Sequence, residues 1–205
     1  LASHNHNGGG ADGNDAVATA NASGGGAFSG VGANTLASAS ADMNTQLGGG
    51  GAQLRAVTGD FSAITRSGNR ATTLASGLSV GIVGLGSVRG DALAGGVMTN
   101  AGTNSATPDN QATTVLAGTS VISGGDVLLQ SISDQAAFSD TTAPSGGVIS
   151  GASNDSSALV RRNLSASLNA GSNVNAAGAV KVSALGSGDA RVDPRVGGAA
   201  ALGDK

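Results

Sequence analysis

The chain has 205 residues and a net charge of −3, and it contains 36 Gly but no Cys, Trp or Tyr. The lack of Cys excludes disulfides and thiolate metal sites. The sequence has no apolar run of the roughly 20 residues that a membrane-spanning helix needs, and the scarcity of basic runs and aromatic residues argues against nucleic-acid binding. Because 39% of the residues are hydrophobic and 11% are charged, the composition favours an ordered β-structure with a thin core of Val, Leu, Ile and Ala over a disordered low-complexity tract.

The N-terminal segment offers two incomplete metal-binding patterns. After the first Gly run, Asp12, Asn14 and Asp15 approach the calcium-binding nonapeptide of secreted β-rolls. Calcium takes roughly six to eight oxygen ligands, and these residues supply only part of that shell, so we expect a solvated turn, with a Ca²⁺ site as the alternative. His4 and His6 would share one face of a strand, but no Cys or Glu completes a metal site, and we expect a polar loop.

Short alternating apolar runs recur along the rest of the chain. Alternation with a period of two over four to eight residues predicts a β-strand. Clusters of Gly, Asn, Asp and Ser separate the runs and predict turns. The runs are Leu54-x-Ala56-x-Thr58, Leu78-x-Val80-x-Ile82, Val127-x-Leu129-x-Ser131 and Val180-x-Val182-x-Ala184.

The segment 89–111 interrupts this pattern and contains Pro108. It matches no other part of the chain, so we interpret it as an insertion that forms a protruding loop. The loop would begin with Arg89, Gly90 and Asp91, the tripeptide that integrins recognise. A three-residue match arises readily by chance in a chain rich in Gly and Asp, so receptor binding here is an alternative and not the leading hypothesis.

An internal repeat gives the strongest evidence about architecture. The C-terminal half repeats with a shift of 53 residues, and a Gly pair at 146–147 matches one at 197–198 with a shift of 51. The N-terminal half shows shifts of 53 to 55, and the repeat predicts four imperfect units, roughly 1–53, 54–112, 113–165 and 166–205. The repeated positions are Gly118, Val121, Gly125, Val127 and Asp140, matched by Gly171, Val174, Gly178, Val180 and Asp193.

Short strands that recur at a fixed period predict stacking of one unit on the next. We expect an all-β fold, a right-handed parallel β-helix (β-solenoid) of about 8–10 coils, with two or more coils per unit and rungs about 4.8 Å apart. A narrow lumen explains why small and β-branched residues replace aromatic ones. Gly and Asn suit the corners, where a positive φ is often required.

The repeats resemble those of filamentous-haemagglutinin-like and other giant repetitive bacterial surface adhesins. The resemblance rests on the pattern Ala-Gly-(Ser/Thr)-x-Val-x-x-(Gly/Ala)-Gly-x-Val in residues 117–131 and 170–184, and on the Gly-Val-rich stretch 78–86. It covers about two-thirds of the chain, mainly 54–88 and 113–204. It implies a right-handed parallel β-helix, secretion to the cell surface, and a role as a fibre or adhesin stalk. It brings no catalytic residues with it.

The sequence therefore favours a non-enzymatic, extracellular structural segment without a cofactor, whose partners are neighbouring copies or further repeats. We expect end-to-end association through terminal strands, and we expect the segment to belong to a longer chain. Three alternatives stay open: an adhesin tip that binds a glycan or receptor through the 89–111 loop, a carbohydrate-active β-helix enzyme, and an ice-binding solenoid. The enzyme would need Asp side chains clustered across coils, whereas Asp140 and Asp193 recur singly, as turn-capping residues would.

Overall fold

The computed structural model describes residues 3–6, 13–41, 43–98, 107–108 and 112–200, and every regular element in these ranges is a β-strand. Four long strands dominate: β2 (Gly13–Ala39), β5 (Phe61–Ala94), β10 (Val127–Val160) and β13 (Val180–Ala200). The shorter strands are β1 (Ser3–His6), β3 (Asn44–Leu47), β4 (Gln53–Ala56), β6 (Gly96–Val97), β7 (Thr107–Pro108), β8 (Ala112–Leu116), β9 (Ser120–Ser123), β11 (Leu164–Leu168) and β12 (Asn173–Ala176). The fold is therefore all-β, as the alternating runs predict.

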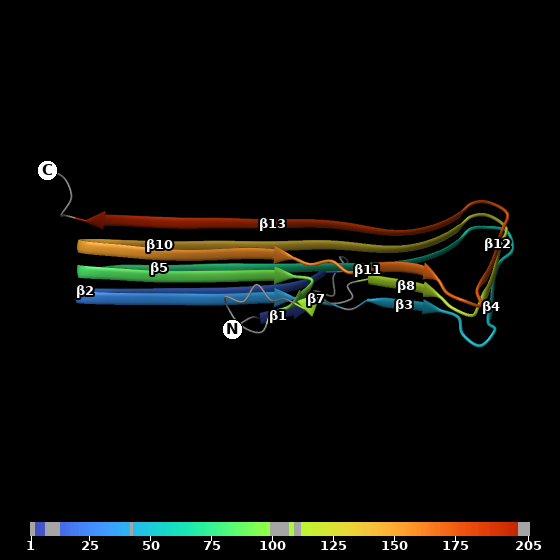
Figure 1. Ribbon diagram of the computed structural model, residues 1–205, viewed down its shortest axis with the longest axis horizontal. Helices are drawn as coiled ribbons and strands as arrows, with labels where there is room; N and C mark the ends of the chain where they lie inside the picture. Colours follow the sequence, from blue (N-terminus) through green and yellow to red (C-terminus); the bar gives the residue numbers. More distant parts are fainter. Residues whose placement is uncertain (1–2, 7–12, 42, 99–106, 109–111, 201–205) are drawn as a thin grey trace.

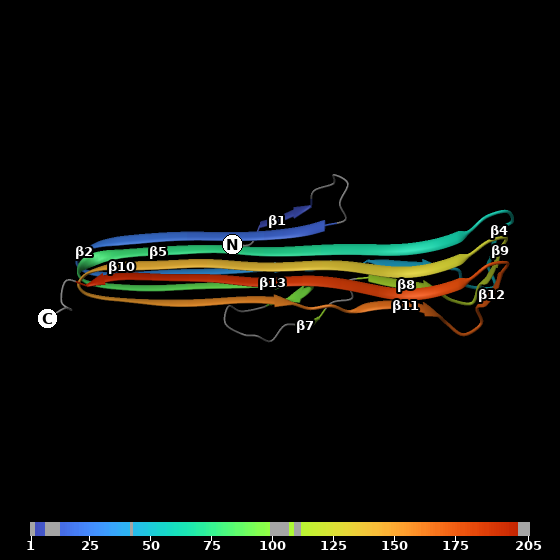
Figure 2. The same cartoon turned by 90° about the horizontal axis from the view of Figure 1, so that it is seen from above.

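The long strands stack in parallel as the coils of a flattened solenoid (Figures 1 and 2). They form one sheet in the order β1-β2-β5-β10-β13, and β2, β5 and β10 each contain an outgoing half and a returning half joined by a narrow turn. Strands β3, β8 and β11 continue the returning halves, and β4, β9 and β12 close the opposite, wide end. In Figure 1 the returning halves lie in front and run to the right while the chain climbs from β2 to β13, so the winding is right-handed.

The number of coils differs from the expected eight to ten. The described chain forms three complete coils, which begin at β2, β5 and β10, followed by the outgoing strand β13 of a fourth. Each repeat is thus one long coil and not two short ones. The reason is the spacing of the corners: 20 residues separate the start of β5 from the narrow turn at Gly81, a straight run of roughly 65 Å.

Small side chains fill the lumen, as predicted. Along the outgoing halves of β5 and β10 every second residue is buried, and most of these residues are Ala, Ser, Thr or Gly. The middle of the lumen is an alanine cluster drawn from three coils (Ala16, Ala18, Ala37, Ala39, Ala71, Ala92, Ala94 and Ala137). The larger apolar residues gather at the wide end, where Leu116, Val121, Val127 and Leu129 pack together, while Val88 and Leu93 are buried along the returning half of β5. The core is therefore thin in the middle and thick at the wide end.

One predicted core run lies on the surface instead. Leu78, Val80 and Ile82 alternate as a strand should, but they occupy the outward positions of β5, with Ile82 58% exposed. The inward positions between and beside them hold Gly77 and Ser79, both buried. A side chain on Gly77 would overlap Val88 of the returning half. The space between the two halves holds Val88 but is too narrow for a second branched residue opposite it, so the apolar alternation of 78–82 points outward.

The residue-by-residue pairing of the long strands corrects the shifts that the sequence repeat predicts. Strand β10 pairs with β13 at a constant shift of 53, so Gly146 faces Ala199 and the matched Gly pair, with its shift of 51, is not in register. Strand β2 pairs with β5 at 55, and β5 with β10 at 66. The extra length in the second coil lies between β5 and β8. The insertion accordingly begins after Ala94, six residues later than the predicted 89–111 segment.

A column of glycines forms the narrow turn. Gly26, Gly81 and Gly147 are in register on three successive coils. Gly26 and Gly147 have positive φ angles of 145° and 158°. A Cβ on Gly81 would overlap the carbonyl oxygen of Gly26, and a Cβ on Gly147 would overlap that of Gly81. The coils can therefore turn and stack at this point only if the column remains glycine.

We predict that Gly81→Ala lowers the free energy of unfolding by roughly 2 kcal/mol, because the new methyl group forces the neighbouring backbone apart. The matched control is Gly146→Ala, since no atom lies within 4 Å of a Cβ at that position. Urea unfolding followed by circular dichroism measures both. Equal stability of the two variants would contradict the close packing of the column.

Candidate functional site

The predicted receptor-binding tripeptide does not lie in a protruding loop. Arg89, Gly90 and Asp91 belong to the returning half of β5, where all three are paired with β10. Asp91 is 1% exposed. A Cβ on Gly90 would touch the side chains of Thr141 and Ser139 across the lumen. The tripeptide is therefore built into the wall of the solenoid, since the inserted segment starts only after Ala94.

Its charged groups form a bridge between the second and third coils. Arg89 Nε donates to Asp91 Oδ2 at 2.7 Å, and Arg89 Nη1 lies 2.7 Å from Asp155 Oδ2 on the third coil. Ser157 Oγ donates to Asp91 Oδ1 at 2.6 Å. The hydrogen bond to Asp91, with the negative charges of Asp91 and Asp155, raises the pKa of Arg89. Every polar atom of the Asp91 carboxylate thus has a partner from its own coil or the next.

The predicted N-terminal ligands lie at the beginning of the solenoid. Asn14 and Asp15 start β2, where their backbones pair with β1 on one side and with Asn69 and Arg70 on the other. Asp12 lies outside the described residues. His4 and His6 lie in β1, which runs antiparallel along the edge of β2, so the expected polar loop is a strand. No group of three or more His, Cys, Asp or Glu side chains able to hold a metal occurs in the described ranges.

The repeated positions form the corners and core of the wide end. Gly118 and Gly171 have positive φ angles of 57° and 82°, which suit the turns that precede β9 and β12. Val121 and Val174 pair in register and point into the core, as does Val127. Val180 pairs with Val127, yet it is 47% exposed because β13 has no returning half over it among the described residues.

Comparison of the sequence repeats did not identify two aspartates beside these corners, Asp60 and Asp126, which are here called the aspartate staple. Asp60 Oδ1 accepts a hydrogen bond from the backbone N of Asp126 at 2.8 Å, and Asp126 Oδ1 accepts one from the N of Ala179 at 2.8 Å. Gly125 and Gly178 provide the room, because a Cβ on either would overlap the carboxylate below it. The recurrence of Gly-Asp before Phe61 and Val127 is a signal that could have identified the staple.

Asp140 and Asp193 are in register, but they lie within strands and not at turns. Arg195 pairs with Asp193 and lies 4.0 Å from Asp140. The hydrogen bond from Arg195 lowers the pKa of Asp193. Along the outward face of β13, Asp189 and Arg191 form a second pair at 2.8 Å. The two aspartates therefore lie beside Arg195 on the outer face of neighbouring strands and do not cap turns.

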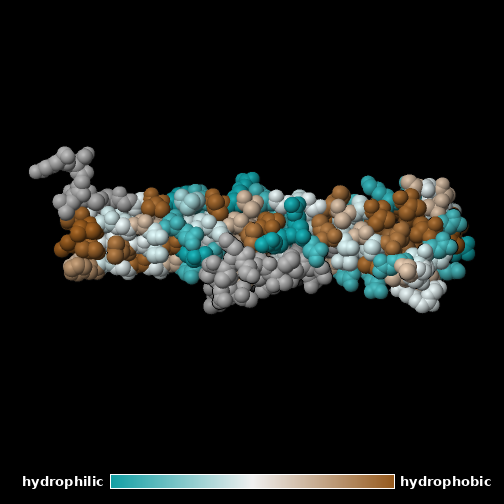
Figure 3. Space-filling view, viewed as in Figure 1, coloured by the Kyte–Doolittle hydropathy of each residue, from teal (hydrophilic) through white to brown (hydrophobic). Residues whose placement is uncertain are grey.

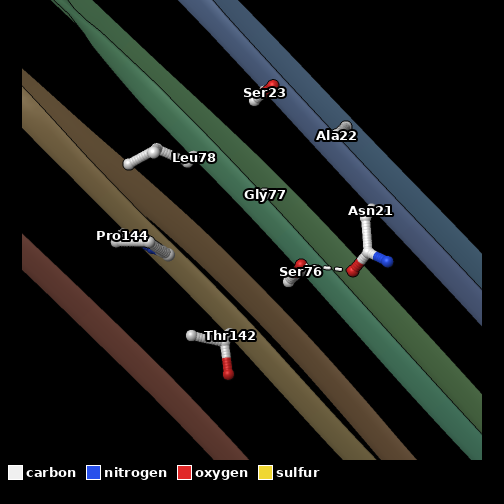
Figure 4. A pocket seen from close by; sticks show the side chains of 8 residues that line it. All are labelled: Asn21, Ala22, Ser23, Ser76, Gly77, Leu78, Thr142 and Pro144. Carbon is white, nitrogen blue, oxygen red and sulfur yellow. Dashed lines mark hydrogen bonds between the residues drawn. The ribbon is translucent and has the colours of Figure 1, made fainter.

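The outer face also carries one shallow depression (Figure 4). Asn21, Ser76 and Thr142 line it from three successive coils, and Leu78 and Pro144 border it. Ser76 Oγ donates to Asn21 Oδ1 at 2.6 Å. Its volume is about 260 Å³ and it contains no charged group. Its hydroxyl and amide groups can hydrogen-bond a neutral polar molecule, but it holds no acid, base or nucleophile pair.

The most extended unpaired feature is the edge of β13. Val127 N donates to Ala179 O, so odd-numbered residues of β13 direct their backbone groups toward β10 and even-numbered ones direct theirs away. Pro194 is even-numbered and therefore removes no hydrogen bond to β10. In the interior strand β10, pairing with β5 is interrupted at Ala143 and Pro144. No described strand pairs with the outer edge of β13.

Comparisons with known proteins gave no match among family models, curated proteins or solved structures. Within the described residues, no helix is long and apolar enough to cross a membrane.

We predict that Arg89→Gln destabilises the fold by roughly 2 kcal/mol, because it leaves the buried Asp91 carboxylate without its counter-charge. Arg191→Gln is the control, since it breaks an exposed pair of similar spacing and should have little effect. Urea titrations give both values. Adding Asp91→Asn to Arg89→Gln should recover part of the loss, and a purely additive double variant would show that the pair is not coupled.

Proposed function

We propose that this chain is a structural, non-enzymatic segment of an extracellular bacterial surface fibre or adhesin stalk. The observation that supports this best is the unbroken parallel register of the long strands. Strand β5 pairs with β10 from Phe61 to Ala94, with only short gaps at the proline and at the turn, and β13 continues the same ladder. Such a ladder holds each coil to the next along its whole length and makes the stack stiff.

The lumen and the outer face support the same role. Buried hydroxyl groups bind one coil to another: Ser131 Oγ donates to Thr114 Oγ1 at 3.0 Å, and Ser139 Oγ donates to the backbone carbonyl of Gly90. On the outer face of β13 two arginines pair with neighbouring aspartates, Arg191 with Asp189 and Arg195 with Asp193. These groups are committed to contacts within the chain, which suits a stalk better than a catalytic surface.

To add a further coil, the stack needs a strand whose outer backbone groups are unpaired, and β13 is such a strand among the described residues. Its even-numbered backbone groups face away from β10, and the inward side chains Val180 and Val182 are partly exposed. A further repeat or a neighbouring copy would continue the ladder from this edge. The opposite edge is partly occupied, because β1 pairs with residues 14–17 of β2. We therefore propose that association proceeds from the β13 side.

We expect the purified chain to form filaments by electron microscopy, with a fibre reflection at about 4.8 Å along the axis. Ala190→Pro should slow filament growth without unfolding the chain, because residue 190 directs its N–H to the free edge and the change removes one hydrogen bond to the next coil. Asp189→Pro is the matched control: residue 189 faces β10, so this variant should lose stability. Filaments that form equally well with Ala190→Pro would rule out growth from this edge.

A further inference from the structure

The narrow end of the solenoid carries an exposed apolar cluster, here called the apolar tip. Phe28, Val83 and Ile149 are in register on three coils and form a ladder across the turn. Phe28 is 82% exposed and Ile149 57% exposed. The apolar tip consists of Phe28, Ile82, Val83, Leu85, Val148 and Ile149. In Figure 3 a group of hydrophobic residues lies at this end of the molecule, and another lies toward the wide end.

The apolar tip is also free of charge. No Asp, Glu, Lys, Arg or His occurs in residues 16–41, 71–88 or 141–154, which form the narrow end of the first three coils. Among the described residues of the fourth coil, the charged residue nearest the turn is Arg195, which pairs with Thr142, five residues before Gly147. At about 3.3 Å per residue this places it roughly 16 Å from the turn. The apolar tip can therefore leave water without desolvating an ion.

The backbone of the tip is largely hydrogen-bonded between coils. Gly26, Gly81 and Gly147 pair across the turn, and the ladder resumes at Phe28, Val83 and Ile149. An ordinary loop would expose unpaired N–H and C=O groups, each of which is costly to transfer into an apolar medium. The stacked turn presents fewer of them and instead presents its side chains.

Geometry favours a lipid surface over a second copy of the chain. Three stacked turns are about 14 Å tall and, with two sheets and their side chains, about 20 Å wide, or roughly 300 Å². Two such tips would bury roughly 600 Å² in total, well below the 1,200–2,000 Å² or so of a stable interface. Leu85 lies two residues behind Val83, so the cluster is about 7 Å deep. That depth matches the roughly 5–10 Å to which apolar groups enter the interfacial region of a bilayer.

We propose that the apolar tip docks into the interfacial region of an electrically neutral lipid bilayer, with Phe28 and Ile149 entering the acyl boundary. The contact involves the end face of the solenoid, so each coil of the stack adds one apolar turn to it. It uses neither the edge of β13 nor the Arg89 bridge. The proposal therefore stands apart from the stalk function, and either can fail without the other.

The test is flotation of the 205-residue protein with phosphatidylcholine vesicles in a sucrose gradient. We expect the protein to float, with little change between low and high salt, because no charge takes part. Phe28→Ser should weaken partitioning about tenfold or more, and the pair Ile82→Ser with Ile149→Ser should weaken it further. Val57→Ser is the matched control, because Val57 is 70% exposed but directly follows β4, one of the strands that close the wide end. It should float like the unmodified protein.

A second measurement does not depend on a loss of binding. Phe28→Trp introduces the only Trp in the chain, and its emission should shift to shorter wavelength when vesicles are added. Failure to float together with an unshifted emission would overturn the proposal. So would flotation that Phe28→Ser leaves unchanged. A dimer detected by light scattering without lipid, and lost in Phe28→Ser, would assign the tip to a second copy instead. Melting curves of each variant check that these surface changes leave the fold intact.

Discussion

The narrow separation of the two halves of each coil is the constraint on which the rest of the structure depends. Gly90 packs directly on Ser139 and Thr141, and Gly77 on Val88, with no room for a further methyl group. In the middle of the coil most inward residues are Ala, Ser, Thr or Gly, and Asn69, Leu93 and Gln135 are the larger exceptions. In most proteins large apolar side chains hold such layers together, but here buried hydroxyl groups hold one coil to the next by hydrogen bonds. Thr73 Oγ1, for example, donates to Ser139 Oγ at 3.0 Å.

A thin lumen also moves the larger apolar residues outward. Because a strand alternates between two faces, a β-branched or Leu residue that cannot point inward must point to solvent, as Val80 and Ile82 do. Only the wide end, with its third wall of short strands, has space for Leu116 and Leu129. The apolar tip and the buried wide end are two consequences of one restriction on volume.

Stacking in register turns single residues into columns, and each column has one physical task. The glycine column allows the narrow turn, the Asp60 and Asp126 staple fixes the corner before each outgoing strand, and the Arg89 bridge joins two coils through a buried carboxylate. None of these tasks requires a ligand. Rigidity and a defined surface are what this arrangement produces, and the proposed stalk and the proposed lipid contact both use them.

The sequence by itself determined the fold class and the repeat, because strand alternation and glycine-bounded turns are local properties. The 53-residue shift from Val127 to Val180 is the observed pairing of β10 with β13. Only the tertiary structure decided the number of coils, which face of each alternating strand is buried, and which groups surround each charged side chain. Period-two patterns do not say which face is buried, so Leu78 was expected inside and lies outside. Asp91 meets Ser157 across 66 residues, and its burial depends on where the inserted segment leaves the wall, which no local pattern encodes.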